Sequence, residues 1–279
     1  MIIALFPHSQ KKESKHLAIG IRDYLTARGA TVLAEDPIAE DIGATPLSSV
    51  DPTKIDFLLS MGGDGTILGL VHKYSHLDAA IIGINLGHLG FMADIPVSDI
   101  YPSLQDLLSG EYTIDERLAI DGTLPSEEQT FAVNELVIHR GKNPSLIELS
   151  LHVGETYLNT FVADGIIIST PNGSTAYSLA AGGPILTPNL SAVVITPISP
   201  HTISNRPIVL SLEEEIQIQY LSDFEPVEVR ADGITQHELH TGDVLQVSQS
   251  EKIFRLVNLT RHDYFSTLRT KLGWAGKLR

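Results

Sequence analysis

The order of hydrophobic and polar residues changes character about 100 residues into the chain. Before that point, short apolar runs typical of buried strands alternate with segments whose apolar residues recur at helical spacing. The clearest helical segment covers residues 11–28, where Leu17, Ile21 and Leu25 share one face and Gly29 follows as a stop. The predicted strands are 2–6, 31–34, 55–61 and 79–84, and a second helical pattern covers 67–74. This rhythm predicts a parallel sheet flanked by helices.

From about residue 115 the apolar runs become shorter and turn residues separate them. This spacing predicts a mainly antiparallel sandwich. The strand-like segments are 131–139, 145–153, 157–163, 166–170, 192–197, 216–220, 227–231 and 244–248. The tail, 263–272, has a helical pattern again, and we expect it to pack on the first domain.

A chain of 279 residues exceeds one typical domain, and the change of pattern predicts where two domains divide. We expect an α/β fold with an N-terminal Rossmann-like parallel-sheet domain and a C-terminal, mainly antiparallel β-sandwich domain. The predicted α/β domain comprises residues 1–98 and 261–279, and the predicted β-rich domain comprises residues 99–260.

Composition excludes several kinds of protein. The chain has no cysteine, which excludes disulfides, thiolate nucleophiles and cysteine-based zinc sites. Its formal net charge of −15 opposes a grip on a phosphate backbone, so we expect no nucleic-acid partner. No apolar stretch approaches the roughly 18 residues of a membrane span, and residues 1–7 lack the basic leader of a signal peptide. We therefore expect a cytoplasmic protein with no membrane partner.

The first candidate site is the segment Met-Gly-Gly-Asp-Gly-Thr at residues 61–66, between a predicted strand and a predicted helix. Its glycines have no Cβ, so the backbone can approach a phosphate chain while N–H groups of the helix N-terminus point at it. Asp64 is the only charge in this segment. A carboxylate there would repel phosphate unless it holds a metal ion or accepts a proton, which suits a magnesium ligand or a general base. The alternative is a tight turn in which Asp64 caps the helix.

Two further segments combine apolar strands with polar side chains. Residues 164–177 form a strand followed by a loop rich in hydroxyls and amides, without positive charge, as recognition of a ribose or an adenine edge requires. The alternative is a polar loop with a helix cap. Asn134 and Glu135 interrupt another apolar strand, so they either form a solvated edge or face a site.

Two weaker candidate segments are present, and several well-known catalytic motifs are absent from the sequence. The glycine-rich stretch 83–91 follows a strand and could form the floor of a site. The stretch His-Glu-Leu-His at 237–240 has histidines three apart and strand-like flanks, so we expect no metal site there. The phosphate loop of P-loop enzymes, the G-x-G-x-x-G fingerprint, H-E-x-x-H and the G-x-S-x-G elbow are all absent, which disfavours P-loop enzymes, typical dehydrogenases and lipase-like hydrolases.

Taken together, Gly-Gly-Asp-Gly-Thr at 62–66, Asn134-Glu135 and the segment 164–177 resemble the NAD kinase family in their order and separation. The resemblance covers most of the chain, to Asp232-Gly233 and beyond. It implies transfer of the terminal phosphoryl group of ATP, or of polyphosphate, to the adenosine ribose 2′-hydroxyl of NAD, which gives NADP. It also implies an α/β domain followed by a β-rich NAD-binding domain, a divalent metal such as Mg²⁺, and a homodimer or homotetramer.

The resemblance also assigns roles to individual residues. Asp64 corresponds to the family's catalytic proton acceptor, and Asn134 and Glu135 correspond to the pair that holds the NAD ribose. Asp164 matches a carboxylate near the nicotinamide end, and Tyr177 a residue that stacks on or borders a ring. The full set of implied nucleotide-binding residues is Gly62, Gly63, Gly65, Thr66, His72, Asn134, Glu135, Asp164, Asn172, Thr175, Ala176, Tyr177, Ser178, Leu179, Ala180 and Ile234.

Three of these positions need comment. Asn172 stands where many family members have Thr or Ser, and it can still form hydrogen bonds. Ile234 stands where the usual run is Asp-Gly-Gln, and an apolar side chain cannot donate the amide contact. His72 falls where the family often has a basic residue near phosphate, although its helical position also suits an ordinary surface histidine.

Two alternatives stay open at this level. Diacylglycerol and sphingoid kinases also use a Gly-Gly-Asp-Gly loop, but the hydroxyl-rich loop at 170–177 does not supply the apolar cleft that their substrates need. A binding module that senses NAD without transfer is the non-enzymatic alternative. The sequence leaves the choice between ATP and polyphosphate, the acceptance of NADH and the oligomeric state open.

Overall fold

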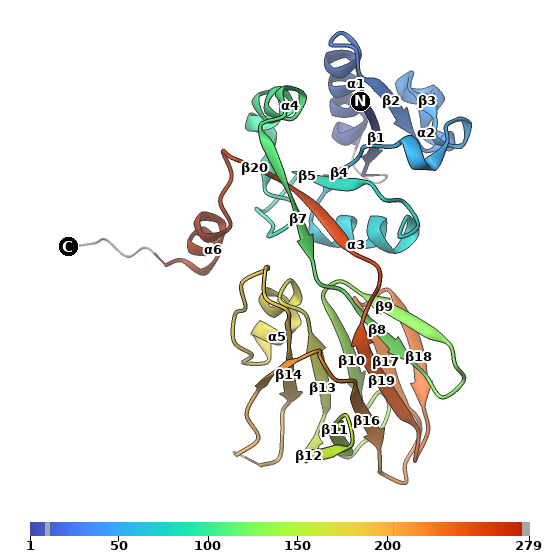
Figure 1. Ribbon diagram of the computed structural model, residues 1–279, viewed down its shortest axis with the longest axis vertical. Coiled ribbons are helices and arrows are strands. Elements are labelled where there is room, and N and C mark those ends of the chain that lie inside the picture. Colours follow the sequence, from blue (N-terminus) through green and yellow to red (C-terminus); the bar gives the residue numbers. More distant parts are fainter. Residues whose placement is uncertain (9–11, 203, 275–279) are drawn as a thin grey trace, which may run out of the picture. The chain divides into compact units, whose positions relative to one another are not determined.

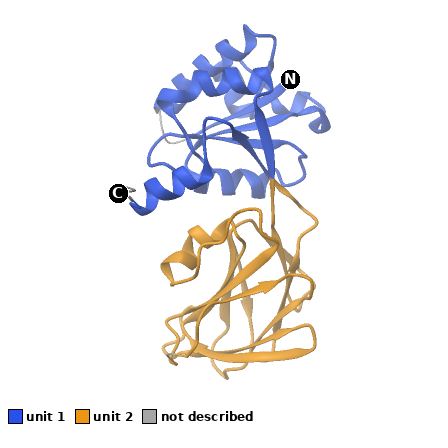
Figure 2. Cartoon of the chain, turned by 60° about the vertical axis from the view of Figure 1, so that its left-hand side comes forward, with its two compact units in different colours: residues 1–115, 255–279 blue, residues 116–254 orange. Residues whose placement is uncertain are grey.

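Two compact units, each with its own hydrophobic core, make up the computed structural model (Figure 1). The structure describes residues 1–8, 12–202 and 204–274. Unit 1 consists of Met1–Asp115 and Arg255–Arg279, and unit 2 consists of Glu116–Phe254 (Figure 2). The chain therefore passes between the units at 115/116 and 254/255, whereas the sequence predicts 98/99 and 260/261.

Unit 1 carries a largely parallel sheet flanked by helices, which confirms the predicted α/β architecture. The strand order of this sheet is β3-β2-β1-β4-β5-β20-β7, with β6 beside β5. The strands are β1 Ile2–Pro7, β2 Thr31–Ala34, β3 Thr45–Pro46, β4 Phe57–Gly62, β5 Ala80–Asn85, β6 Ile95–Pro96, β7 Tyr112–Arg117 and β20 Phe254–Leu259. The helices are α1 Lys12–Thr26, α2 Asp36–Ile42, α3 Asp64–Lys73, α4 Ile100–Ser109 and α6 Tyr264–Leu272.

The two faces of this sheet carry different helices. Because side chains alternate along a strand, Leu59 of β4 joins the cluster formed with Ile21 of α1 and Leu104 of α4. Gly83 of β5 faces α3, because a Cβ added there would lie 2.7 Å from Cδ1 of Ile67. None of the helices in the described ranges is long and apolar enough to cross a membrane.

Unit 2 is a sandwich of two antiparallel sheets, as the sequence predicts. One sheet has the order β15-β14-β13-β10-β17-β18 and the other β12-β11-β16-β19-β8-β9, and their apolar faces form one core. The strands are β8 Ile120–Thr123, β9 Gln129–Ala132, β10 Glu135–His139, β11 Ile147–Val153, β12 Thr156–Ala163, β13 Gly165–Ser169, β14 Ala192–Ile198, β15 Ile208–Ser211, β16 Ile216–Tyr220, β17 Val227–Ala231, β18 Thr235–Leu239 and β19 Val244–Gln249. The short helix α5, Tyr177–Ala180, follows β13.

The structure departs from the sequence-based prediction in three elements. The predicted strand 131–139 is two strands, because the chain leaves one sheet after β9 and enters the other at β10. Helix α2 lies in a polar stretch between two predicted strands, for which the sequence analysis predicts no element; it has Pro37 in its first turn and ends at Gly43 in the left-handed conformation. Helix α4 lies beyond the predicted domain boundary, yet its apolar face belongs to the core of unit 1.

The expected tail helix is present as α6, with Asp263 as its N-cap. It packs on unit 1 through Lys271, whose ammonium donates to the carbonyl of Leu89 at 2.7 Å and lies 4.7 Å from the centre of the Phe91 ring. These contacts join α6 to the loop after β5.

Candidate active site

Asp64 is the first residue of α3, directly after the N-cap Gly63. The parallel register pairs Gly62 with Asn85, so the loops that follow β4 and β5 leave the carboxyl edge of the sheet as neighbours. The loop after β5 supplies three backbone N–H groups to the Asp64 carboxylate. Phe91 donates to Oδ2 at 2.8 Å, and Met92 and Ala93 donate to Oδ1 at 3.1 and 2.9 Å.

These hydrogen bonds set what the Asp64 carboxylate can still do. A carboxylate offers about four lone-pair positions, of which Oδ1 uses two here and Oδ2 one. Oδ2 therefore keeps one position for a further donor. The carboxylate points toward the loop after β5, so the alternative in which Asp64 caps its own helix is wrong. The sequence suggested this loop as a floor of the site, but its role in anchoring the carboxylate could not be read from the residues.

The loop that holds Asp64 is itself held by hydrogen bonds from Asn85 and by a close approach at Gly90. Asn85 Oδ1 accepts the N–H of Gly87 at 2.6 Å, and Asn85 Nδ2 donates to the carbonyl of Ala93 at 3.2 Å. Gly90 allows the close approach, because a Cβ there would lie 2.0 Å from Oδ1 of Asp64. Only a residue without a side chain fits between the loop and this carboxylate.

The glycines of the 62–66 segment serve different purposes. A Cβ on Gly62 would lie 2.2 Å from Oγ1 of Thr66, so internal packing requires that glycine. Gly63 and Gly65 have neither a positive φ nor any protein atom within 4 Å of an added Cβ. The fold therefore does not explain these two glycines, whereas close approach of a ligand to the backbone at the N-terminus of α3 would explain them.

A cavity of about 230 Å³ opens beside this segment within unit 1. Thr66, Gly69 and Lys73 of α3 line one wall, and residues that follow β1 and β2, His8 and Glu35 among them, line the other. His72, two helical turns beyond Asp64, lies roughly 12 Å away along the axis of α3. The part of α3 that lines the cavity therefore runs from the glycine-rich segment to Lys73.

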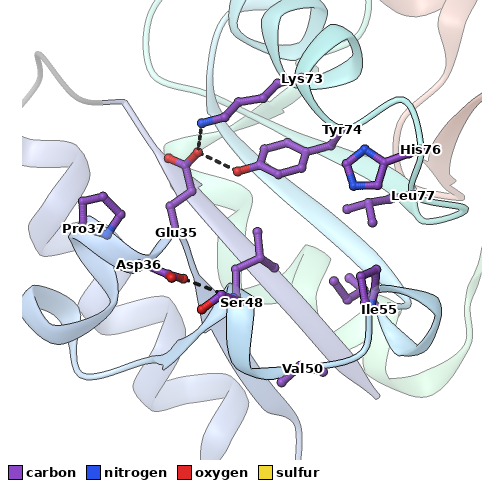
Figure 3. Close-up of a pocket in the computed structure, with 12 residues that line it drawn as sticks. Glu35, Asp36, Pro37, Ser48, Val50, Ile55, Lys73, Tyr74, His76 and Leu77 are labelled. Atoms are coloured by element: carbon purple, nitrogen blue, oxygen red, sulfur yellow. Dashed lines mark hydrogen bonds and ion pairs between the residues drawn. The ribbon is translucent and has the colours of Figure 1, made fainter.

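Glu35, Lys73 and Tyr74 line this cavity and also a second, larger hollow of about 450 Å³, which Figure 3 shows. Figure 3 shows the ammonium of Lys73 and the hydroxyl of Tyr74 both directed at the Glu35 carboxylate, and the hydroxyl donates to Oε1 at 2.7 Å. Burial and the bond to Glu35 raise the pKa of Tyr74 to about 12, so this hydroxyl stays a donor at neutral pH. The three side chains form a fixed wall behind the cavity.

In unit 2, Asn134 and Glu135 lie where the chain crosses from β9 to β10. Asp232, in the left-handed conformation with φ of 52°, holds this crossing. Its carboxylate accepts the N–H groups of Val133, Asn134 and Glu135 at 2.8, 2.8 and 3.0 Å. Both candidate residues are buried, and β10 lies inside its sheet between β13 and β17. The alternative of a solvated sheet edge is therefore wrong.

Glu135 is an unusual carboxyl group. Its side chain is 8% exposed, and Oε2 accepts no hydrogen bond from the residues that the structure describes. Burial, together with the charge of Asp232, raises the pKa of Glu135 from 4.5 to about 8. Buried groups with such shifts are found at functional sites, because a ligand can supply the missing partner.

The loop after β13 packs directly on Asn134. The N–H of Thr170 donates to the carbonyl of Asn134 at 2.8 Å, and a Cβ on Gly173 would lie 2.2 Å from that carbonyl oxygen. Nδ2 of Asn172 donates to Oδ1 of Asn134 at 2.6 Å. Nη1 of Arg117, a residue that the sequence analysis did not single out, donates to Oδ1 of Asn172. No motif marks Arg117, because its role depends on a contact across 55 residues.

Most hydroxyls of this loop are used inside the protein. Thr170, Ser174 and Ser178 bond to Val133, Pro171 and Thr196 at 2.6, 2.7 and 2.8 Å. These hydroxyls shape the loop. Recognition of a ribose would need them to face outward, and they do not. Among the predicted residues of this loop and of α5, Tyr177, which is 42% exposed, and Ala180 are exposed, while Thr175, Ala176 and Leu179 are half-buried.

Two predicted residues of unit 2, Asp164 and Ile234, form no hydrogen bond or ion pair with Asn134 or Glu135 in the described part of the chain. Asp164 precedes β13, whose register pairs Gly165 with His139 and Ser169 with Glu135, so Asp164 lies at the far end of the strand, roughly 17 Å from Glu135. There it forms an ion pair with Nε of Arg140 at 2.7 Å. Ile234 follows Asp232 in a turn and is 47% exposed, an apolar side chain without a polar role.

Comparison with known proteins gives a consistent result. Residues 3–112 match the ATP-NAD kinase N-terminal domain, and residues 133–259 match the ATP-NAD kinase C-terminal domain. The chain is 55% identical over 278 residues to the NAD kinase of Protochlamydia amoebophila, with 100% of each chain covered.

Two solved structures share the fold. A yeast NADH kinase complexed with NADH is 26% identical with a TM-score of 0.86, covering 100% of this chain and 89% of that one. An NAD kinase from Archaeoglobus fulgidus in complex with ATP is 24% identical with a TM-score of 0.77, covering 99% and 100%, and so supports the fold alone. The family matches and the 55% identity together decide the question: this chain belongs to the NAD kinase family.

Proposed function

We propose that Asp64 is the general base of this NAD kinase, which phosphorylates NAD to NADP with ATP. The hydroxyl that receives the phosphoryl group is the adenosine ribose 2′-hydroxyl. One observation carries the proposal: three backbone N–H groups fix the Asp64 carboxylate, and Oδ2 keeps one lone pair for an incoming O–H group. A base held in this way needs no reorganisation when the hydroxyl arrives.

Proton removal would accompany attack on the donor. The ribose hydroxyl donates to Oδ2 of Asp64, its oxygen forms the new bond to phosphorus, and the bond from phosphorus to the leaving nucleoside diphosphate breaks. Asp64 takes the proton as the attacking oxygen loses it. General base catalysis of this kind contributes a factor of about 10²–10⁴, and positioning accounts for much of the remainder.

The donor would lie along α3 in unit 1. Gly63 and Gly65 leave the backbone open to phosphate oxygens, and the N-terminus of α3 supplies unpaired N–H groups for them. The cavity of about 230 Å³ beside Thr66 has room for part of a nucleoside, and the ion pair of Lys73 and Glu35 lines its wall. Magnesium would enter as part of the donor, held chiefly by its phosphates, because Mg²⁺ in such sites uses few protein carboxylates.

Asn134 and Glu135 would hold the dinucleotide. Oε2 of Glu135 is a buried acceptor without a donor among the described residues, and a ribose hydroxyl is a suitable donor. Its raised pKa means that nucleotide binding would draw the group toward the carboxylate form, since the hydroxyl bonds best to an ionised acceptor. Recognition of NAD would therefore be linked to loss of a proton.

Replacement of Asp64 by Asn tests the base. We expect Asp64→Asn to lower kcat at least 100-fold while the Kd for NAD, measured by calorimetry, stays within a few-fold. Because Asn also disturbs the bond from the Phe91 N–H, Lys271→Met is the matched control: it loosens the same loop through Leu89 but keeps the carboxylate. The control should lose only a few-fold in kcat. Near-normal turnover in Asp64→Asn would show that Asp64 is not the base.

Further expectations from the resemblance stay predictions. They are the use of polyphosphate as donor, a homodimer or homotetramer, a cytoplasmic location, and roles for His72, Asp164 and Ile234 in nucleotide binding. A coupled assay for NADP, run with ATP and polyphosphate in turn, decides the donor. The same assay with NADH as acceptor, which the complex of the yeast NADH kinase makes worth testing, would detect NADPH.

A further inference from the structure

Three polar side chains form a buried chain of hydrogen bonds that ends at Asn134. Arg117, Asn172 and Asn134 are 6%, 7% and 7% exposed. Nη1 of Arg117 donates to Oδ1 of Asn172, and Nδ2 of Asn172 donates to Oδ1 of Asn134 at 2.6 Å. All three residues belong to unit 2. The chain joins Arg117, at the end of β7, to one of the residues proposed to hold the dinucleotide.

The chemistry of arginine fixes the direction of every bond in this chain. A guanidinium only donates hydrogen bonds, so the atom of Asn172 that faces it must be the carbonyl oxygen. The amide nitrogen of Asn172 must then face Asn134, whose nearest atom has to be an acceptor as well. Oδ1 of Asn134 is thereby turned toward Asn172, and Nδ2 of Asn134 is left as the group that can meet a ligand.

We propose that Arg117 is a positioning residue for nucleotide binding: through Asn172, it turns the Asn134 amide so that an N–H donor, not a carbonyl, faces the dinucleotide. The inference rests on the proposed function, in which Asn134 contacts NAD. The bond from Asn172 occupies Oδ1 of Asn134, so Nδ2 is the donor that its side chain can offer a ligand, and Oε2 of the neighbouring Glu135 is a buried acceptor without a donor among the described residues. A sugar diol, whose hydroxyls both accept and donate, is the ligand chemistry that this pair fits.

The charge of Arg117 makes a purely space-filling role expensive. Burying a guanidinium costs several kcal/mol, and buried ionic groups replaced by apolar ones often leave stability unchanged or improved. An amide alone could turn either way at little cost, because its oxygen and nitrogen ends have nearly the same shape. The guanidinium of Arg117 can only donate hydrogen bonds, so it removes this freedom from both amides. Arg117 thus gives Asn172 and Asn134 one orientation in the absence of ligand.

Three substitutions separate orientation from structural support. Arg117→Met fills the space but cannot donate, whereas Arg117→Lys keeps a donor that cannot accept. Asn172→Asp keeps size and can pair with Arg117, but presents oxygen to Asn134, which must turn its N–H group inward and its carbonyl toward the ligand. Thr130→Val is the matched control, because it breaks another side-chain hydrogen bond of unit 2, between the buried Thr130 and the half-buried Thr235 at 2.9 Å.

We expect steady-state kinetics to separate KM from kcat. Arg117→Met should raise the KM for NAD about tenfold with kcat within about twofold, and Arg117→Lys should restore the KM to within about threefold. Asn172→Asp should raise the KM about 30-fold without lowering the melting temperature. Thr130→Val should lower the melting temperature and leave the KM unchanged. Calorimetric Kd values for NAD should follow the same order.

The opposite results are equally distinct. If Asn172→Asp binds NAD as the wild type does, or if Arg117→Met and Arg117→Lys lose affinity equally, the orientation role is overturned. Asn134→Ala separates this from failure of the proposed function. If the KM for NAD rises in Asn134→Ala but stays at the wild-type value in Arg117→Met and Asn172→Asp, only the positioning role of Arg117 is overturned. If the KM is unchanged in Asn134→Ala, both the role of Asn134 in binding NAD and the positioning role of Arg117 are overturned.

Discussion

The raised pKa of Glu135 predicts that nucleotide-free unit 2 becomes less stable as pH rises, and that Glu135→Gln removes the effect. The pKa is 4.5 in a free side chain and about 8 in the folded protein. The folded state therefore holds a proton that the unfolded state releases. This stabilisation is complete below pH 4.5 and is lost as pH rises through about 8. At about 1.4 kcal/mol per pH unit, the whole interval corresponds to roughly 5 kcal/mol.

Other groups also titrate in this range, so the measurement must isolate Glu135. Gln keeps the shape of the protonated side chain but cannot release a proton. Between pH 6 and 7.5, the stability of the wild type relative to Glu135→Gln should fall by about 2 kcal/mol. Native-state hydrogen exchange of β10 and β13 amides, measured side by side at each pH, reports this difference, because intrinsic exchange rates cancel between the two proteins.

Saturating NAD provides an internal check on the same pair of proteins. A ribose hydroxyl bonded to Oε2 favours the carboxylate, so the pH-dependent difference should shrink when the nucleotide is bound. A difference between wild type and Glu135→Gln that stays constant from pH 6 to 7.5 without nucleotide would refute the reasoning. It would mean that Glu135 titrates at the same pH in the folded and unfolded chains.

Three other outcomes follow from the site. Gly90→Ala should lower kcat about 100-fold, because its Cβ would lie 2.0 Å from Oδ1 of Asp64 and displace the base; an unchanged kcat would contradict the anchoring. Gly69→Leu should raise the KM for ATP several-fold and leave the KM for NAD unchanged, because the side chain would enter the cavity beside Thr66; equal effects on both substrates would place the donor elsewhere. Between pH 6 and 7 the KM for NAD should fall about tenfold in the wild type, as the Glu135 carboxylate forms, and stay level in Glu135→Gln; parallel profiles would exclude a role for this ionisation.

The pattern of hydrophobic residues was sufficient to predict the architecture, because each unit buries its strands in a regular way. The runs 2–6, 55–61 and 79–84 correspond to β1, β4 and β5, and the glycine-rich segment lies at the carboxyl edge of the sheet as its spacing indicates. The crossing at Val133 was missed, since apolar residues continue through it from one sheet to the other. An apolar run shows burial, but not which sheet buries it.

The contacts that make the site work were not predictable for a different reason. Asp64 is held by backbone N–H groups 27 to 29 residues away, and Arg117 reaches Asn172 across 55 residues. Backbone donors have no identity in a sequence, because every residue except proline has one. The resemblance could therefore name Asp64 and Asn134 as candidate site residues, while the groups that orient them become visible only in three dimensions.

The two carboxyl groups that we assign to the reaction differ in what the fold gives them, and this difference supports their separate roles. Asp64 receives three N–H donors and keeps one lone pair, so its position is fixed before the hydroxyl arrives. Glu135 receives no donor from the described chain at Oε2 and lies near a second carboxylate, Asp232. Its ionised form is therefore disfavoured until a ligand donates a hydrogen bond to it. A base must be oriented in advance to act in the transition state. A group that binds substrate gains selectivity when only the correct ligand relieves its unsatisfied state, because a nucleotide without that hydroxyl would leave a buried acceptor unpaired.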